Sequence, residues 1–142
     1  MPSNETKPLT VSTRVNLPVE KVWKYWSAPE DIKQWNNASD DWHTPAATND
    51  LRVGGQFSST MAARDGSMSF EFGGEYSRVE EHKVIEYALG DGRQVKILFE
   101  GDGDSTTVTE TFDPEGTNPL EMQQAGWQAI INNFKRYAEA KG

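Results

Sequence analysis

Residues 119–141 read PLEMQQAGWQAIINNFKRYAEAK, and this stretch constrains the architecture more than any other. Large apolar side chains recur in it at helical spacing and fall on one side of the helix. These positions are Leu120, Trp127, Ile130, Ile131, Phe134, Tyr137 and Ala138. A helix of about twenty residues is about 30 Å long. The stretch therefore predicts one long helix that must bury its apolar stripe against another layer of the molecule.

The layer beneath this helix is predicted by the alternating sequence that ends at residue 112. Asp-Gly pairs at 65–66, 91–92 and 102–103 are typical of tight turns between antiparallel strands. Apolar positions such as Val95 and Ile97 alternate with polar ones, so one face of the sheet should be apolar. We predict strands at roughly 47–53, 56–64, 68–80, 84–89, 93–100 and 105–112.

The segment before the sheet predicts one more strand and two short helices. Thr10–Asn16 alternates like a strand. Pro18 is a favoured first helical residue, and apolar positions at helical spacing follow it at Val19, Val22, Trp23 and Trp26. Pro29 interrupts this stripe, and residues 30–35 are expected to form a second short helix.

The order of these elements predicts an α+β, two-layer fold. A curved antiparallel sheet should grip the long C-terminal helix, with the two short helices after the first strand. Gly54-Gly55 and Gly73-Gly74 lie inside strand patterns, where paired glycines mark bends that curl a sheet. Residues 1–8 are expected to be a flexible tail, and residues 9–142 a single domain.

One polar segment has no strand-like alternation. Residues 36–50 are small, polar and acidic, with Trp42 as the one large apolar side chain. We interpret this segment as a long loop. Because long loops often serve function, we expect Trp42 and His43 to lie at the entrance of a cleft.

The composition excludes several function classes. Lys and Arg number 14 against 22 Asp and Glu, a net charge of −8, which disfavours nucleic acid as a partner. With no cysteine there is no disulfide or thiolate site. We find no apolar stretch long enough for a membrane span, so we expect a cytoplasmic protein without membrane insertion. A monomer or weak dimer is expected, and a protein partner stays open.

Signatures of metal and catalytic sites are absent from the sequence. Gly101–Asp104 has too few oxygen ligands for a calcium loop, so a hairpin turn explains it better. His82 lies in a polar turn, and His43 has no partner in the sequence that marks it as a catalytic base. We therefore expect no metal, no cofactor and no catalytic residue, and a binding protein rather than an enzyme.

A set of motifs resembles one known family. The motifs are Pro18-Val19-Glu20-Lys21-Val22-Trp23, Trp35, Leu51-Arg52-Val53-Gly54-Gly55-Gln56-Phe57, Gly73-Gly74-Glu75-Tyr76 and Gly126-Trp127. Their order, from about Leu9 to Ala140, is similar to that of the activator of heat shock protein 90 ATPase homologue (AHSA) domains. These domains belong to the START-like (SRPBCC, or polyketide-cyclase-like) helix-grip superfamily. The resemblance implies a cleft between sheet and long helix that holds lipids, polyketides, flavonoids or similar molecules.

The candidate binding residues are mainly aromatic side chains expected on the concave face. Periodicity alone favours a filled core for many of them, whereas the resemblance favours a cavity. The candidates are Trp35, Trp42, His43, Phe57, Met61, Phe70, Phe72, Tyr87, Ile97, Phe99, Glu110, Trp127 and Ile131.

Glu110 is the most informative of these candidates because it is a carboxylate between Val108 and Phe112 on the apolar face. Burial would raise its pKa, whereas a cation such as Arg52 or Arg93 would lower it. A strand bulge would instead place it in solvent. We expect the chain to bind a small hydrophobic or aromatic molecule. The alternatives are a cyclase- or hydrolase-type enzyme that uses Glu110 or His43, and a co-chaperone-like protein-interaction domain without a cavity.

Overall fold

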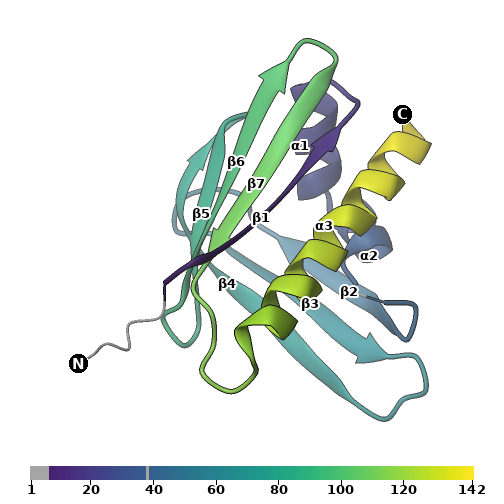
Figure 1. The fold of residues 1–142 in the computed structure, drawn as a ribbon, viewed down its shortest axis with the longest axis vertical. Coiled ribbons are helices and arrows are strands. Elements are labelled where there is room, and N and C mark those ends of the chain that lie inside the picture. Colours follow the sequence, from purple (N-terminus) through teal and green to yellow (C-terminus); the bar gives the residue numbers. More distant parts are fainter. Residues whose placement is uncertain (1–6, 38) are drawn as a thin grey trace.

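The computed structural model describes residues 7–37 and 39–142, and it confirms the α+β architecture of a curled sheet and one long helix (Figure 1). Most of the expected tail, residues 1–6, lies outside the described residues. The elements in chain order are β1 (Leu9–Val15), α1 (Val19–Ser27), α2 (Pro29–Trp35), β2 (Trp42–Asn49), β3 (Gln56–Ala63), β4 (Ser69–Glu80), β5 (Val84–Leu89), β6 (Gln94–Asp102), β7 (Ser105–Phe112) and α3 (Leu120–Lys141).

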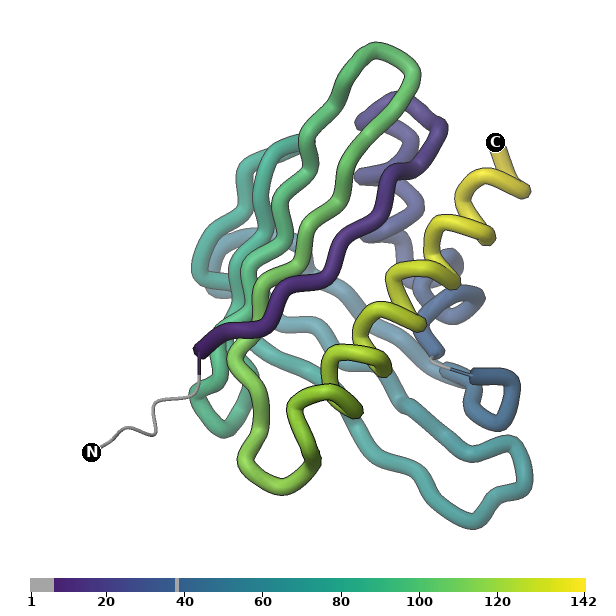
Figure 2. The backbone as a smooth tube through the Cα atoms, viewed as in Figure 1, coloured from purple at the N-terminus to yellow at the C-terminus, as the bar shows by residue number. Residues whose placement is uncertain are grey.

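The seven strands form one antiparallel sheet in the order β1-β7-β6-β5-β4-β3-β2. Strands β2 to β7 are a meander in which each strand pairs with the next along the chain. Strand β1 joins the other end of the meander and pairs with β7, as the purple and green tubes in Figure 2 show. The sheet curls into a half-barrel whose hollow side faces α3, so the helix-grip expectation is confirmed.

The helix α3 is held mainly by the β1 side of the sheet and by the two short helices. It contacts β1, α2 and α1. Ile131, Phe134 and Ala138 on its inner side are fully buried, as the predicted stripe requires, whereas Leu120 at its start is 44% exposed. Over β3 and β4 the helix makes no comparably close backbone approach. The space there is where the candidate site lies.

The prediction of a loop at residues 36–50 is wrong for residues 42–49. Residues 42–49 form the edge strand β2, which pairs with β3 from Trp42↔Ala63 to Asn49↔Phe57. An edge strand needs few apolar residues, and Pro45 is tolerated because the pairing register shifts between His43 and Ala46. The strand expected at 47–53 therefore ends at Asn49.

Two of the four paired glycines permit a close approach of neighbouring strands. A Cβ atom at Gly73 would lie 2.5 Å from the Phe57 carbonyl oxygen, and one at Gly74 would lie 2.4 Å from that of Ala88. Any other residue would push the strands apart at this point. The glycines thus allow β3, β4 and β5 to pack tightly where the sheet curls.

Candidate ligand-binding site

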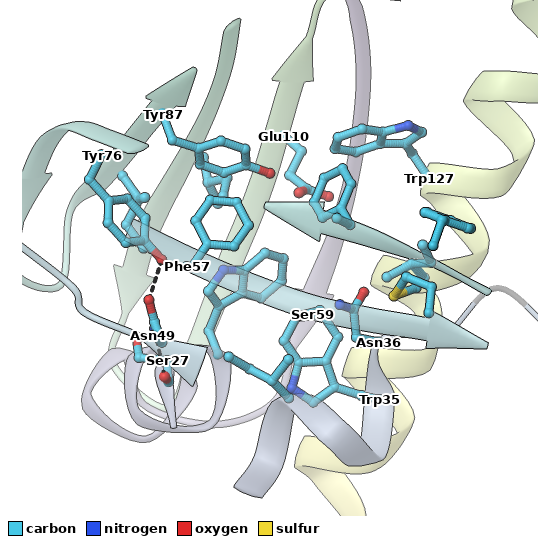
Figure 3. A pocket seen from close by; sticks show the side chains of 18 residues that line it. Ser27, Trp35, Asn36, Asn49, Phe57, Ser59, Tyr76, Tyr87, Glu110 and Trp127 are labelled. Atoms are coloured by element: carbon cyan, nitrogen blue, oxygen red, sulfur yellow. Dashed lines mark hydrogen bonds between the residues drawn. The ribbon is translucent and has the colours of Figure 1, made fainter. Parts of the chain in front are cut away.

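A cavity of about 240 Å³ lies between the hollow face of the sheet and α3 (Figure 3). Eight of the eighteen residues that line it carry aromatic rings: Trp26, Trp35, Phe57, Phe70, Phe72, Tyr76, Tyr87 and Trp127. Aliphatic and sulfur-containing side chains supply most of the remaining wall, at Ile32, Met61, Ile85, Ile97 and Ile130. The polar lining consists of Ser27, Asn36, Asn49, Ser59 and Glu110.

Strand alternation places these side chains on the hollow face. On β3 every second residue faces the cavity, at Phe57, Ser59 and Met61. The same alternation brings in Phe70, Phe72 and Tyr76 from β4, and Ile85 and Tyr87 from β5. Trp127 and Ile130 reach the cavity from α3. The site therefore depends on both layers of the fold.

Ring-to-ring contacts fix the positions of the aromatic walls. Trp127 stacks on Phe112 with ring centroids 4.0 Å apart and an 8° angle between the planes. The ring centroids of Trp26 and Trp35 lie 4.7 Å apart. Phe57 meets Tyr87 edge-to-face at 4.6 Å. Such pairs add stability beyond area burial and restrict side-chain motion, so the cavity is largely preformed.

Two successive hydrogen bonds link three of the lining residues, and Figure 3 shows the first of them, between Tyr76 and Asn49. The Tyr76 hydroxyl donates to the side-chain oxygen of Asn49, and the Asn49 amide nitrogen donates to the Ser27 carbonyl at 2.7 Å. Burial raises the pKa of Tyr76 above its ordinary value. Because these groups are paired with one another, Tyr76 and Asn49 serve mainly to join β4 and β2 to the end of α1.

Glu110 occupies the middle of the hollow face. Its pairing with Val11 on β1 and Ile97 on β6 is regular, so no bulge turns the side chain to solvent. The residue is 5% exposed and its carboxyl points into the cavity, between Tyr87 and Trp127 (Figure 3). The inward orientation expected from strand alternation is confirmed.

Burial raises the pKa of the Glu110 carboxyl from 4.5 to about 8. Among residues 7–37 and 39–142, no hydrogen bond or ion pair joins this carboxyl to another group. Arg52 and Arg93 do not reach it, since Arg52 pairs with Asp50 at 2.9 Å and Arg93 with Asp91 at 2.8 Å. Of the two effects expected on the pKa of Glu110, desolvation raises it, and neither arginine pairs with the carboxyl to lower it.

Tyr87 stands beside Glu110, and its hydroxyl points toward the glutamate (Figure 3). Burial raises the pKa of the Tyr87 hydroxyl, and the nearby Glu110 carboxylate adds to the effect. Both groups are therefore protonated at neutral pH in the empty cavity. Together they form a pair of neighbouring polar groups on a sheet face that is mostly apolar.

Nine of the thirteen candidate residues line the cavity. They are Trp35, Phe57, Met61, Phe70, Phe72, Tyr87, Ile97, Glu110 and Trp127. Phe99 and Ile131 lie instead in the core, where Phe99 packs against Trp23 with ring centroids 5.0 Å apart.

Trp42 and His43 lie outside the cavity because their segment is an edge strand rather than a loop. Trp42 packs against Phe70, with ring centroids 5.8 Å apart. Phe70 lines the cavity and is also 52% exposed. Phe70 therefore marks the opening of the cavity, and Trp42 supports it from outside.

Several lining residues were missed by the sequence reasoning. Ser59 lies between Phe57 and Met61 in a strict alternation, so the period-two pattern was sufficient to find it. Asn36 and Asn49 fell in the segment interpreted as a loop. No sequence signal marked them, because Asn36 is placed by the end of α2 and Asn49 by the pairing of β2 with β3.

We also searched the described part of the chain for a metal site. It contains no group of three or more His, Asp or Glu side chains suited to hold a metal ion. None of the helices in residues 7–37 and 39–142 combines the length and apolarity that crossing a membrane requires.

Comparisons with known proteins support the fold. The family model described as activator of Hsp90 ATPase homolog 1-like protein matches residues 16–139. The solution structure of an AHSA1-like protein from Aeromonas hydrophila is 44% identical, with 94% of each chain covered and a TM-score of 0.86.

A solution structure from Cytophaga hutchinsonii is 56% identical, covers 94% of this chain and 93% of its own, and has a TM-score of 0.82. A crystal structure from Nitrosomonas europaea shares the fold at 20% identity, with both chains fully covered and a TM-score of 0.83. No curated protein matches the chain.

Proposed function

The chain belongs to the activator of Hsp90 ATPase homologue 1-like family, and from this premise we propose that it binds a small hydrophobic or aromatic molecule in the cavity under α3. Folds of this family commonly bind hydrophobic ligands. The observation that carries the proposal is an aromatic-lined cavity with few polar groups, among which Glu110 and Tyr87 lie side by side. Apolar walls with few convergent polar groups are typical of small-molecule sites.

The volume limits the size of the ligand. About 240 Å³ lies just below the usual range of roughly 300–1,000 Å³ for small-molecule pockets. A compact molecule of one or two rings suits this space better than a long-chain lipid. The net charge of −8 continues to disfavour nucleic acid as a partner. We also expect a cytoplasmic monomer or weak dimer.

The proposal is tested by filling the cavity from its floor. Ser59 faces the cavity and is buried. Its neighbour Ser58 faces the other side of the sheet, where it donates a hydrogen bond to Glu71, and it does not line the cavity. We expect Ser59→Leu to block the ligand, and Ser58→Leu, the matched control, to leave binding unchanged.

Wild-type protein and both variants are incubated with a small-molecule extract of the host, separated from unbound compounds and examined by native mass spectrometry. Wild type and Ser58→Leu should carry the same discrete mass increments, and Ser59→Leu should lack them. If Ser59→Leu retains every increment that wild type carries, or wild type carries none, the proposal fails.

A second function, proton-transfer catalysis of the cyclase or hydrolase kind, is favoured by one observation. Burial holds the pKa of Glu110 near 8, close to neutral pH, where a carboxyl group can both donate and accept a proton. An enzyme would convert compounds of the extract in excess over its own concentration, and Glu110→Gln would stop the conversion. A binding protein would only retain a stoichiometric amount.

The third alternative, a protein-interaction domain without a cavity, fits less well. A filled interior between sheet and helix would favour it, and the cavity lined by Trp127, Phe72 and Glu110 is the opposite arrangement.

A further inference from the structure

The side chains that line the cavity include one acidic group and no basic group. Glu110 is the one carboxyl group among the eighteen lining residues, and none of those eighteen is lysine, arginine or histidine. The other titratable group that faces Glu110 is the hydroxyl of Tyr87 on β5, whereas the Tyr76 hydroxyl on β4 is turned to Asn49. None of these three groups is positive. Arg93 lies near enough to lower the pKa of Tyr87, but it pairs with Asp91 and forms no ion pair with Glu110, so a ligand is the expected source of a paired counter-charge.

The walls around this carboxyl are suited to a positive group. Aromatic faces carry a negative electrostatic potential, and they attract cations more strongly when water is excluded. Tyr87 and Trp127 flank Glu110 on either side (Figure 3). Phe57 on β3 and Phe72 on β4 line the same cavity. Several rings around one carboxyl form the kind of cage that recognises organic ammonium groups.

Neutral hydrogen bonding does not require a carboxyl at this position. The cavity already offers the hydroxyls of Tyr87 and Ser59 and the amide of Asn36. A glutamine at position 110 would add a neutral donor and acceptor without the cost of a buried, unpaired acid. What Glu110 adds is the capacity for negative charge.

We propose that the ligand is a compact organic cation, an aromatic or apolar amine or protonated nitrogen heterocycle, with Glu110 as its counter-ion and the surrounding rings as its cage. This inference rests on the proposed function, that the cavity is a small-molecule site. The net charge of −8 would also concentrate cations around the molecule. In the empty cavity the carboxyl holds a proton, and the entering ammonium group displaces that proton to solvent.

The inference is tested with three probes that share an indole ring and differ in charge: tryptamine, tryptophol and indole-3-propionate. Isothermal titration calorimetry at pH 7.5 measures each against wild type, Glu110→Gln and Glu71→Gln. Glu71 is an exposed glutamate hydrogen-bonded to Ser58 and Thr60 on the outer side of the sheet, so it is the matched control.

We expect wild type and Glu71→Gln to bind tryptamine at least about tenfold more tightly than tryptophol, and indole-3-propionate weakest. Glu110→Gln should lose the preference for tryptamine and keep its affinity for tryptophol. The circular dichroism spectra of the variants report that they are folded.

Two results overturn the inference and separate it from the proposed function. If wild type binds tryptophol or indole-3-propionate as tightly as tryptamine, the cavity is a ligand site without preference for cations. If none of the three probes binds at millimolar concentration, both the cation preference and the cavity as a site for compact aromatic molecules are contradicted. A tryptamine preference that persists in Glu110→Gln would place the counter-ion elsewhere.

Discussion

At the scale of single residues, Glu110 links the cavity to the stability of the fold. Its carboxyl keeps a proton in the folded protein up to a pKa of about 8, whereas the unfolded chain releases it near 4.5. The folded state therefore binds more protons than the unfolded state between these values, and the free energy of unfolding falls as pH rises through this window. Below 4.5 the carboxyl is protonated in both states and costs nothing.

This difference predicts the behaviour of Glu110→Gln in the absence of ligand. The interval from 4.5 to about 8 corresponds to at most about 5 kcal/mol, at about 1.4 kcal/mol for each pKa unit. Relative to wild type, the variant should gain stability steadily from pH 5 to pH 8 and remain constant above it. Urea denaturation at a series of pH values measures this difference.

Glu71→Gln is the control for this experiment. Hydrogen bonds from Thr60 and Ser58 lower the pKa of Glu71, so its contribution changes only in acid. The control should keep the wild-type slope from pH 5 to pH 8. A wild-type slope that is identical in Glu110→Gln would show that Glu110 is not protonated in the folded protein.

The sequence could predict the orientation of Glu110, but not whether an arginine would pair with it. Alternation with Val108 and Phe112 was sufficient to aim it inward. Whether Arg52 or Arg93 would pair with it depended on the turns that hold them. Both arginines are engaged by an aspartate two residues earlier in the chain, at Asp50 and Asp91. Because these aspartates are only two residues away in the chain, they pair with the arginines in place of the distant Glu110.

At the scale of elements, α3 is attached to the sheet through Trp127. This side chain stacks on Phe112 at the end of β7 and also forms part of the cavity wall. Trp127→Ala should lower the free energy of unfolding by about 3 kcal/mol, at the lower end for tryptophan because the residue is only partly buried. Arg136→Ala, on the exposed side of α3, is the control and should cost less than about 0.5 kcal/mol. An equal denaturation midpoint for both variants would argue against the stacking role.

The other end of α3 is held by a polar contact with α2. Asp31 is buried, and it accepts hydrogen bonds from the Tyr137 hydroxyl and from Lys141 Nζ, the latter at 2.7 Å. Asp31→Ala removes a charged acceptor and should cost about 2 kcal/mol in chemical denaturation. Glu30→Ala, at the exposed position next to it, should be nearly neutral. Equal effects of the two substitutions would mean that the contact does not stabilise the folded protein.

Most elements were predictable because local chemistry agrees with the fold. Asp-Gly turns and alternation located β3 to β7, and helical spacing located α1 and α3. The first part of β2, residues 42–46, was missed because an edge strand has little apolar signature, and the strand expected at 47–53 overlaps only the end of β2. Within β2 Thr44 is buried, but nothing in the sequence distinguishes this threonine from exposed ones.

At the scale of the whole molecule, the cavity exists because α3 approaches one half of the sheet and not the other. It packs on β1, and the space over β3 and β4 is bordered by aromatic side chains such as Phe57 and Phe72. Periodicity could name inward-facing rings, yet core and cavity residues share the same pattern. Phe99 and Tyr87 both alternate inward and both are buried, yet only Tyr87 also borders the cavity.

The tryptophans provide the most direct test that this cavity is a ligand site. The chain has five, and each indole N–H gives its own signal in a ¹H–¹⁵N NMR spectrum. Trp26, Trp35 and Trp127 line the cavity, whereas Trp23 is buried against His82 and Phe99 outside it. Titration of ¹⁵N-labelled protein with a compact aromatic probe such as indole should shift the three cavity signals saturably and leave that of Trp23 in place. Cavity signals that stay fixed, or a Trp23 signal that moves as much as they do, would contradict the account.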